Sequence, residues 1–125
     1  MVRMVRHKRY TRNPVGAHYG VRDWLLQRLT AVVMAGYTIF AILAMLLHRP
    51  LNYAAWKSVF SETWFQVGTM LFVAALLYHA WVGMRDILMD YLKATSLRLT
   101  AQAAVGLMLL FYFFWAASIL WGLSK

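Results

Sequence analysis

The segment that decides the fold is TWFQVGTMLFVAALLYHAWVGM, residues 63–84, which holds 22 consecutive residues without a formal charge. About 20 apolar residues in an α-helix cross the hydrocarbon core of a bilayer, which is about 30 Å thick. The apolar residues run continuously and do not alternate with polar ones, which argues against a strand of a membrane barrel. In lipid, a helix satisfies the hydrogen bonds of its own backbone. We therefore predict a transmembrane helix here, and it carries one histidine, His79.

Two further uncharged segments flank this one, with 19 residues at 29–47 and 26 residues at 99–124. The first is too long for the apolar part of a signal peptide and has no small-residue cleavage site, so we expect a retained helix. The fold class is therefore all-α, an integral membrane protein with three transmembrane helices. The predicted spans are about residues 28–48, 63–91 and 98–123.

The charge of the chain is concentrated near its beginning. The net charge is +9 although only 14% of the residues are charged, and seven of the thirteen basic residues lie in the first 28. With the N-terminus in the cytoplasm, ten basic residues fall on the inner side and three on the outer side, as the positive-inside rule requires. We predict a basic cytoplasmic arm at residues 1–22, an anchor domain at 23–125 and a periplasmic C-terminus. A nucleic-acid surface is disfavoured, because 62% of the chain is hydrophobic and little of it could face water.

The chain contains no cysteine. This excludes disulfide bonds, an iron–sulfur cluster held by cysteines of this chain, and covalent attachment of haem through a C-x-x-C-H motif. A redox cofactor bound here would have to be held without cysteine sulfur.

His79 is the residue of greatest chemical interest, because an ionisable side chain within a span is costly and is a functional candidate by default. Four interpretations remain open for it: a packing hydrogen bond to a neighbouring helix, an axial ligand of haem, a proton relay, or a structural metal site. The metal site is the weakest, since the other histidines lie elsewhere in the chain and the carboxylates are too distant to complete it.

Three residues follow His79 along one side of the predicted helix. Gly83, Asp86 and Asp90 come four, seven and eleven residues later, so all lie within about 40° of one line at 100° per residue. Asp90 lies about 16 Å from His79 towards the predicted cytoplasmic side. Gly83 modestly favours haem, since a macrocycle edge-on to a helix needs space beside its ligand, but it also suits close helix packing.

These segments resemble a known family. The runs HAWVGM at 79–84 and DYLK at 90–93, followed by Leu97 and Arg98, resemble the small hydrophobic membrane-anchor subunit (the D subunit) of bacterial succinate dehydrogenase, also called succinate:quinone oxidoreductase. The segment GVRDWLLQRLTA at 20–31 resembles that family's entry into the first span. The likeness covers about residues 20–123 of the chain.

The resemblance implies a role for each of four residues. His79 matches the haem b axial ligand, and a histidine of a partner anchor subunit would occupy the other axial position. Tyr91 matches the tyrosine whose hydroxyl donates a hydrogen bond to a carbonyl of ubiquinone. Asp90 matches a neighbouring acid that helps to organise the quinone site. Arg28 matches a basic residue near the haem propionates.

The resemblance also implies the partners and the location. The three spans would pack with a second hydrophobic anchor (cytochrome b) subunit in the bacterial inner membrane and would anchor an iron–sulfur subunit and a flavoprotein subunit. Electrons from succinate would reach ubiquinone at the membrane surface, and no residue of this chain would oxidise succinate. Two alternatives remain: an anchor of fumarate reductase that works with menaquinone, and a non-redox membrane scaffold or assembly protein in which His79 only packs.

Three features depart from the pattern of the family. Arg22 stands where relatives can have histidine, Arg85 and Asp86 form a more charged pair than we expect, and the basic arm at 1–19 is longer than we expect. The charged pair suits a surface ion pair that contributes little to stability.

Overall fold

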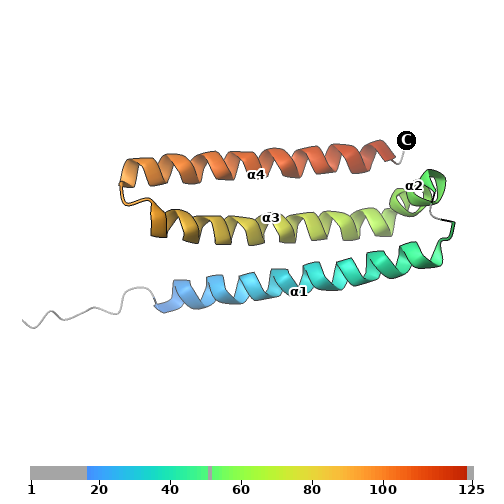
Figure 1. Cartoon of the computed structure of the whole chain (residues 1–125), viewed down its shortest axis with the longest axis horizontal. Helices are drawn as coiled ribbons and strands as arrows, with labels where there is room; N and C mark the ends of the chain where they lie inside the picture. The colour runs from blue at the N-terminus through green and yellow to red at the C-terminus, as the bar shows by residue number, and fades with distance from the viewer. Residues whose placement is uncertain (1–16, 51, 124–125) are drawn as a thin grey trace, which may run out of the picture.

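The computed structural model describes residues 17–50 and 52–123, and every regular element in these ranges is an α-helix (Figure 1). The helices are α1 (Ala17–Leu47), α2 (Tyr53–Ser61), α3 (Thr63–Tyr91) and α4 (Thr95–Leu123). The three long helices are long and apolar enough to cross a membrane. The predicted all-α fold with three membrane spans is therefore confirmed.

The helix boundaries differ slightly from the predicted spans. The part of the predicted arm at residues 1–16 lies outside the described residues, whereas residues 17–22 form the first turns of α1. Helix α4 likewise begins at Thr95, before the predicted start of the third span. A helix can continue beyond the hydrocarbon core because its hydrogen bonds are made within the segment.

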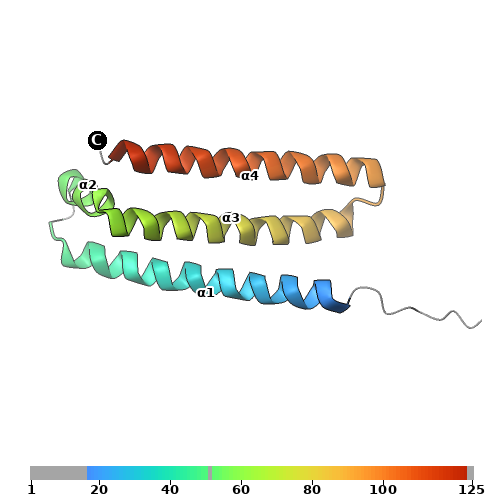
Figure 2. The same ribbon diagram turned by 180° about the vertical axis from the view of Figure 1, so that it is seen from behind.

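The three long helices form a single flat layer with α3 in the middle (Figures 1 and 2). Helix α3 contacts both α1 and α4, whereas no residues of α1 and α4 are in contact within the described parts of the chain. Only five hydrophobic residues of the described chain are buried, and large apolar side chains are exposed on all three long helices. Apolar surface of this extent requires lipid or partner subunits to cover it.

The short helix α2 packs against one end of the layer, which we call the α2 end. The side chain of Asn52 accepts a hydrogen bond from the backbone N–H of Ala55 at 2.8 Å and so caps α2. Phe65 is buried at this end, and its ring contacts the rings of Tyr37, Phe40 and Phe60. Aromatic packing therefore joins α1, α2 and α3 here.

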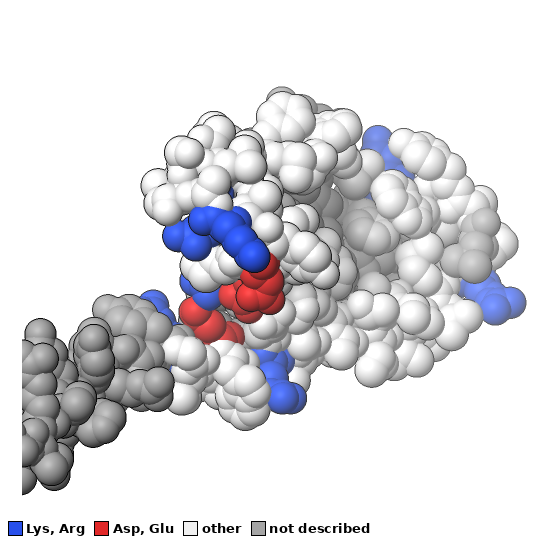
Figure 3. Space-filling model, turned by 60° about the vertical axis from the view of Figure 1, so that its left-hand side comes forward, with Lys and Arg blue, Asp and Glu red and all other residues white. Residues whose placement is uncertain are grey.

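The opposite end, where α1 begins and α3 runs into α4, is called the charged end. Figure 3 brings it forward and shows basic and acidic side chains gathered side by side. Eight of the eleven charged residues in the described ranges lie in the first part of α1, the last part of α3, the loop after α3 or the first turn of α4. They are Arg22, Asp23, Arg28, Arg85, Asp86, Asp90, Lys93 and Arg98.

Candidate functional site

His79 lies on the side of α3 that faces α1, and its ring is partly buried. Its Nδ1 atom is 3.1 Å from the hydroxyl oxygen of Thr30 and 3.2 Å from the backbone oxygen of Gln27. Both partners belong to α1, so the packing hydrogen bond that sequence reasoning considered is present. Sequence reasoning did not identify Thr30 or Gln27, because an apolar segment has no pattern that indicates which turn of α1 faces the histidine.

The second ring nitrogen of His79, Nε2, has no hydrogen-bond partner among the described residues. Metal-ligating histidines generally use one ring nitrogen for the metal and hold the other by a hydrogen bond to a carbonyl or another acceptor. The arrangement around His79 has this form, so the residues present fit an axial ligand of haem as well as a packing histidine.

Gly83 lies one turn beyond His79 and borders α1. A Cβ atom at Gly83 would lie 3.7 Å from Nε2 of the Gln27 side chain, which is an ordinary van der Waals distance. Close packing of α1 and α3 therefore does not require a glycine here. An alanine would also fit at this position.

Asp90 and Tyr91 occupy the last turn of α3 at the charged end, where both are exposed. Tyr91 is 82% exposed, and no interaction joins either side chain to another described residue. Asp90 remains on the side of α3 that carries His79, because the helix is continuous from Thr63 to Tyr91. The phenol and the carboxylate are thus available to a ligand or a partner subunit.

Arg28 is exposed on α1, and its guanidinium carbon lies 4.3 Å from the ring centroid of Trp24. This is a cation–π contact within one helix. Neighbouring side chains of an α-helix are about 100° apart around its axis, so Arg28 points to a different side of α1 from Gln27. The backbone oxygen of Gln27 is the one that contacts His79. Within the described part of the chain, the structure does not bring Arg28 into contact with His79.

The charged pair Arg85 and Asp86 has a third member that sequence reasoning missed. Arg85 forms an ion pair with Asp23 of α1 and a weaker one with Asp86 at 3.5 Å. The available signal was the position of one acidic residue at the beginning of the first span and one basic residue at the end of the second. Arg85 therefore ties α3 to α1 at the charged end.

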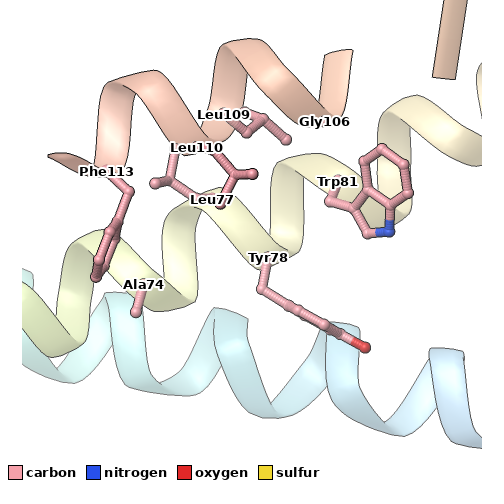
Figure 4. Close-up of a pocket in the computed structure, with 8 residues that line it drawn as sticks. All are labelled: Ala74, Leu77, Tyr78, Trp81, Gly106, Leu109, Leu110 and Phe113. Atoms are coloured by element: carbon pink, nitrogen blue, oxygen red, sulfur yellow. The ribbon is translucent and has the colours of Figure 1, made fainter. Parts of the chain in front are cut away.

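A hollow of about 450 Å³ lies between α3 and α4 (Figure 4). Its lining is almost entirely apolar, and the ring of Trp81 passes close to Gly106, where a Cβ atom would lie 3.5 Å from that ring. The lining holds no carboxylate, histidine, cysteine or basic side chain, so we assign it no chemistry. The lining residues are Ala74, Leu77, Tyr78, Trp81, Gly106, Leu109, Leu110 and Phe113.

The described residues contain no group of three or more histidine, cysteine, aspartate or glutamate residues that could hold a metal ion. A haem axial ligand does not require such a group, because the porphyrin supplies the other ligands of the iron and the protein supplies one or two. His79, whose Nε2 has no partner among the described residues, therefore remains a candidate for a metal ligand.

These features define a multi-pass helical membrane protein whose middle span holds one histidine against the first span. A family model described as the transmembrane subunit of succinate dehydrogenase or fumarate reductase matches residues 3–120, and the chain belongs to this family.

The chain is also similar to individual succinate dehydrogenase hydrophobic membrane anchor subunits. The identity with the subunit of Coxiella burnetii is 39% over 102 residues, which cover 82% of this chain and 89% of the relative. The identity with the subunit of Rickettsia felis is 33% over 90 residues, covering 70% of this chain and 73% of the relative. The resemblance to this membrane-anchor subunit is confirmed.

Proposed function

We propose that this chain is the hydrophobic membrane anchor of a succinate dehydrogenase, that it supplies one axial ligand of haem b, and that it forms part of a ubiquinone site. Its relatives are anchor subunits of succinate dehydrogenase, which favours this enzyme over fumarate reductase. The observation that carries the haem proposal is the orientation of His79, with Nδ1 held by α1 and Nε2 without a described partner.

His79 would bind the haem iron through Nε2, and a histidine of a second anchor subunit would take the other axial position. A bound haem would supply a centre that accepts and releases single electrons. Arg28 is exposed on α1, and we propose that its guanidinium pairs with a haem propionate, since arginine binds carboxylates with two parallel hydrogen bonds.

Tyr91 and Asp90 would form this chain's part of the quinone site at the charged end. A quinone carbonyl is only an acceptor, so the site must provide a donor, and the exposed hydroxyl of Tyr91 can donate. Negative charge grows on the carbonyl oxygen during reduction, and the hydrogen bond strengthens with it. Asp90 would orient the neighbouring groups of the site.

The partners in this proposal are a second hydrophobic anchor (cytochrome b) subunit, an iron–sulfur subunit and a flavoprotein subunit. The two water-soluble subunits would dock at the charged end, where Tyr91 and Asp90 are exposed. That end would face the cytoplasm in the bacterial inner membrane, because it carries the excess of basic residues.

The test is purification of the native complex through an affinity tag on this chain. We expect three further subunits, succinate–ubiquinone activity, and a reduced-minus-oxidised spectrum of a b-type haem. A complex with those subunits but without haem b would overturn the cofactor proposal alone. Purification of the chain without any dehydrogenase subunit would support the scaffold alternative.

A further inference from the structure

The contact between His79 and α1 involves two oxygen atoms with different chemical properties. The backbone oxygen of Gln27, 3.2 Å from Nδ1, can only accept a hydrogen bond. The hydroxyl of Thr30, 3.1 Å from Nδ1, can either donate or accept. The direction of the second hydrogen bond therefore depends on where the hydroxyl hydrogen of Thr30 points.

The hydroxyl hydrogen of Thr30 has acceptors within its own helix. The Thr30 oxygen lies 2.9 Å from the backbone oxygens of both Leu26 and Gln27. Threonine within a helix commonly donates to the backbone oxygen three or four residues earlier. If the hydroxyl instead donated to His79, the Gln27 oxygen would face a nitrogen lone pair at 3.2 Å and both helix oxygens would lose this donor.

The geometry points to a positioning role for Thr30, which rests on the proposed haem ligation: Thr30 and the backbone oxygen of Gln27 hold the hydrogen of His79 on Nδ1 and fix the plane of its ring. The lone pair of the imidazole then lies on Nε2, the atom that would face iron. A hydrogen bond from Nδ1 to an acceptor also makes Nε2 more basic, which favours ferric over ferrous iron.

Thr30 is suited to this role by its position. It lies just inside the uncharged segment that starts at Leu29 and is partly buried, where little water competes for its hydrogen bonds. A threonine also holds its hydroxyl in few rotamers, because its side chain is branched at Cβ.

The test compares Thr30→Val, which removes the hydroxyl and keeps the shape, with Thr30→Ser, which keeps the hydroxyl. Thr38→Val is the matched control, because Thr38 donates to the backbone oxygen of Met34 at 2.8 Å on the same helix and does not contact His79. Each purified complex is examined for its ratio of haem to protein, the low-spin ferric electron paramagnetic resonance signal, and the haem midpoint potential.

We expect Thr30→Val to raise the midpoint potential, to shift and broaden the low-spin signal, and to weaken haem retention about tenfold. The oxygen of Gln27 still accepts from Nδ1 in this variant, so we expect the ligand itself to be retained. Thr30→Ser and Thr38→Val should match the wild type in all three measurements. If Thr30→Val does not assemble, Thr30→Ala serves as a second variant without the hydroxyl.

Two results would overturn the positioning role while leaving haem ligation intact: a wild-type signal and potential in Thr30→Val, or the same changes in Thr30→Ser as in Thr30→Val. His79→Ala distinguishes these failures from failure of the proposed function. If His79→Ala leaves the low-spin signal unchanged, both the ligand assignment and the role of Thr30 are wrong.

Discussion

The two ends of the helix layer are held together by different interactions. At the α2 end, Tyr37 packs on Phe65 and Phe72 and donates to the hydroxyl of Thr69 at 2.5 Å, while Thr69 donates to the backbone oxygen of Phe65 at 2.7 Å. There Gln66 also joins α3 to α4 by donating to the backbone oxygen of Leu120 at 3.1 Å.

The charged end has fewer internal contacts and more available polar groups. Asp23 and Arg85 join α1 to α3, but Nε of Arg85 is buried without a hydrogen-bond partner among the described residues, and Asp90 and Tyr91 are exposed. Buried polar groups are normally paired, so an unpaired one suggests that a partner or ligand completes this end. We therefore propose a structural role for the α2 end and a functional role for the charged end.

The largest effect is expected in an experiment that asks on which side of the membrane each end of the helix layer lies. The chain has no cysteine, so the matched variants Ser58→Cys on α2 and Ser96→Cys on α4 each introduce one exposed thiol. We expect a membrane-impermeant maleimide to label Ser58→Cys in intact spheroplasts and Ser96→Cys only after permeabilisation, because the basic excess keeps the charged end inside. Labelling of Ser96→Cys in intact spheroplasts would reverse the topology.

The next largest effect is expected for Tyr91→Phe, which deletes one hydroxyl and keeps the ring. The lost hydrogen bond should cost on the order of 3 kcal/mol in the transition state and lower succinate–ubiquinone turnover about 100-fold. Haem content and succinate oxidation with artificial acceptors should be unchanged. Tyr53→Phe, the same change at an exposed tyrosine of the α2 end, is the control. Normal turnover in Tyr91→Phe would place Tyr91 among ordinary interfacial aromatic residues.

Much of the fold could be predicted from the sequence, because long uncharged segments and the distribution of basic residues decide the number of spans and suggest their orientation. The stripe from His79 to Asp90 could also be predicted, since it depends only on the periodicity of a helix.

The contacts between helices could not be predicted in the same way. The spans are apolar on every side, so their sequences do not specify which side faces a neighbour. The contact of Thr30 with His79 and the ion pair of Asp23 with Arg85 both depend on which sides of α1 and α3 face each other.

Two glycines of α3 test whether the α2 end is more tightly packed than the charged end, and the expected effect is smaller. A Cβ atom at Gly68 would lie 3.3 Å from the ring of Tyr37, which its hydroxyl and neighbouring rings hold in place, whereas the contact at Gly83 is 3.7 Å. Alanine gains the same helix propensity at both positions, so the difference reports overpacking. We expect Gly68→Ala to be less stable than Gly83→Ala by about 1–2 kcal/mol in thermal denaturation of the complex. Equal stabilities would mean that the α2 end is no more tightly packed.

The smallest effect is expected for the ion pair at the charged end. Asp23→Asn should lower the stability of the complex by about 0.5–1 kcal/mol, since the pair is partly exposed, and the loss should shrink in high salt. Asp86→Asn is the control, because Asp86 is more exposed and lies 3.5 Å from Arg85. A larger loss in Asp86→Asn than in Asp23→Asn would show that the link between α1 and α3 is not the important contact.

We have proposed that His79 offers Nε2 to haem iron while α1 holds Nδ1. The low-spin ferric spectrum of the purified complex carrying His79→Ala tests this proposal. We predict that the bis-histidine signal is lost while the protein still inserts and assembles, with some haem retained by the partner's ligand. An unchanged bis-histidine signal in His79→Ala would show that His79 is not a ligand of the haem iron.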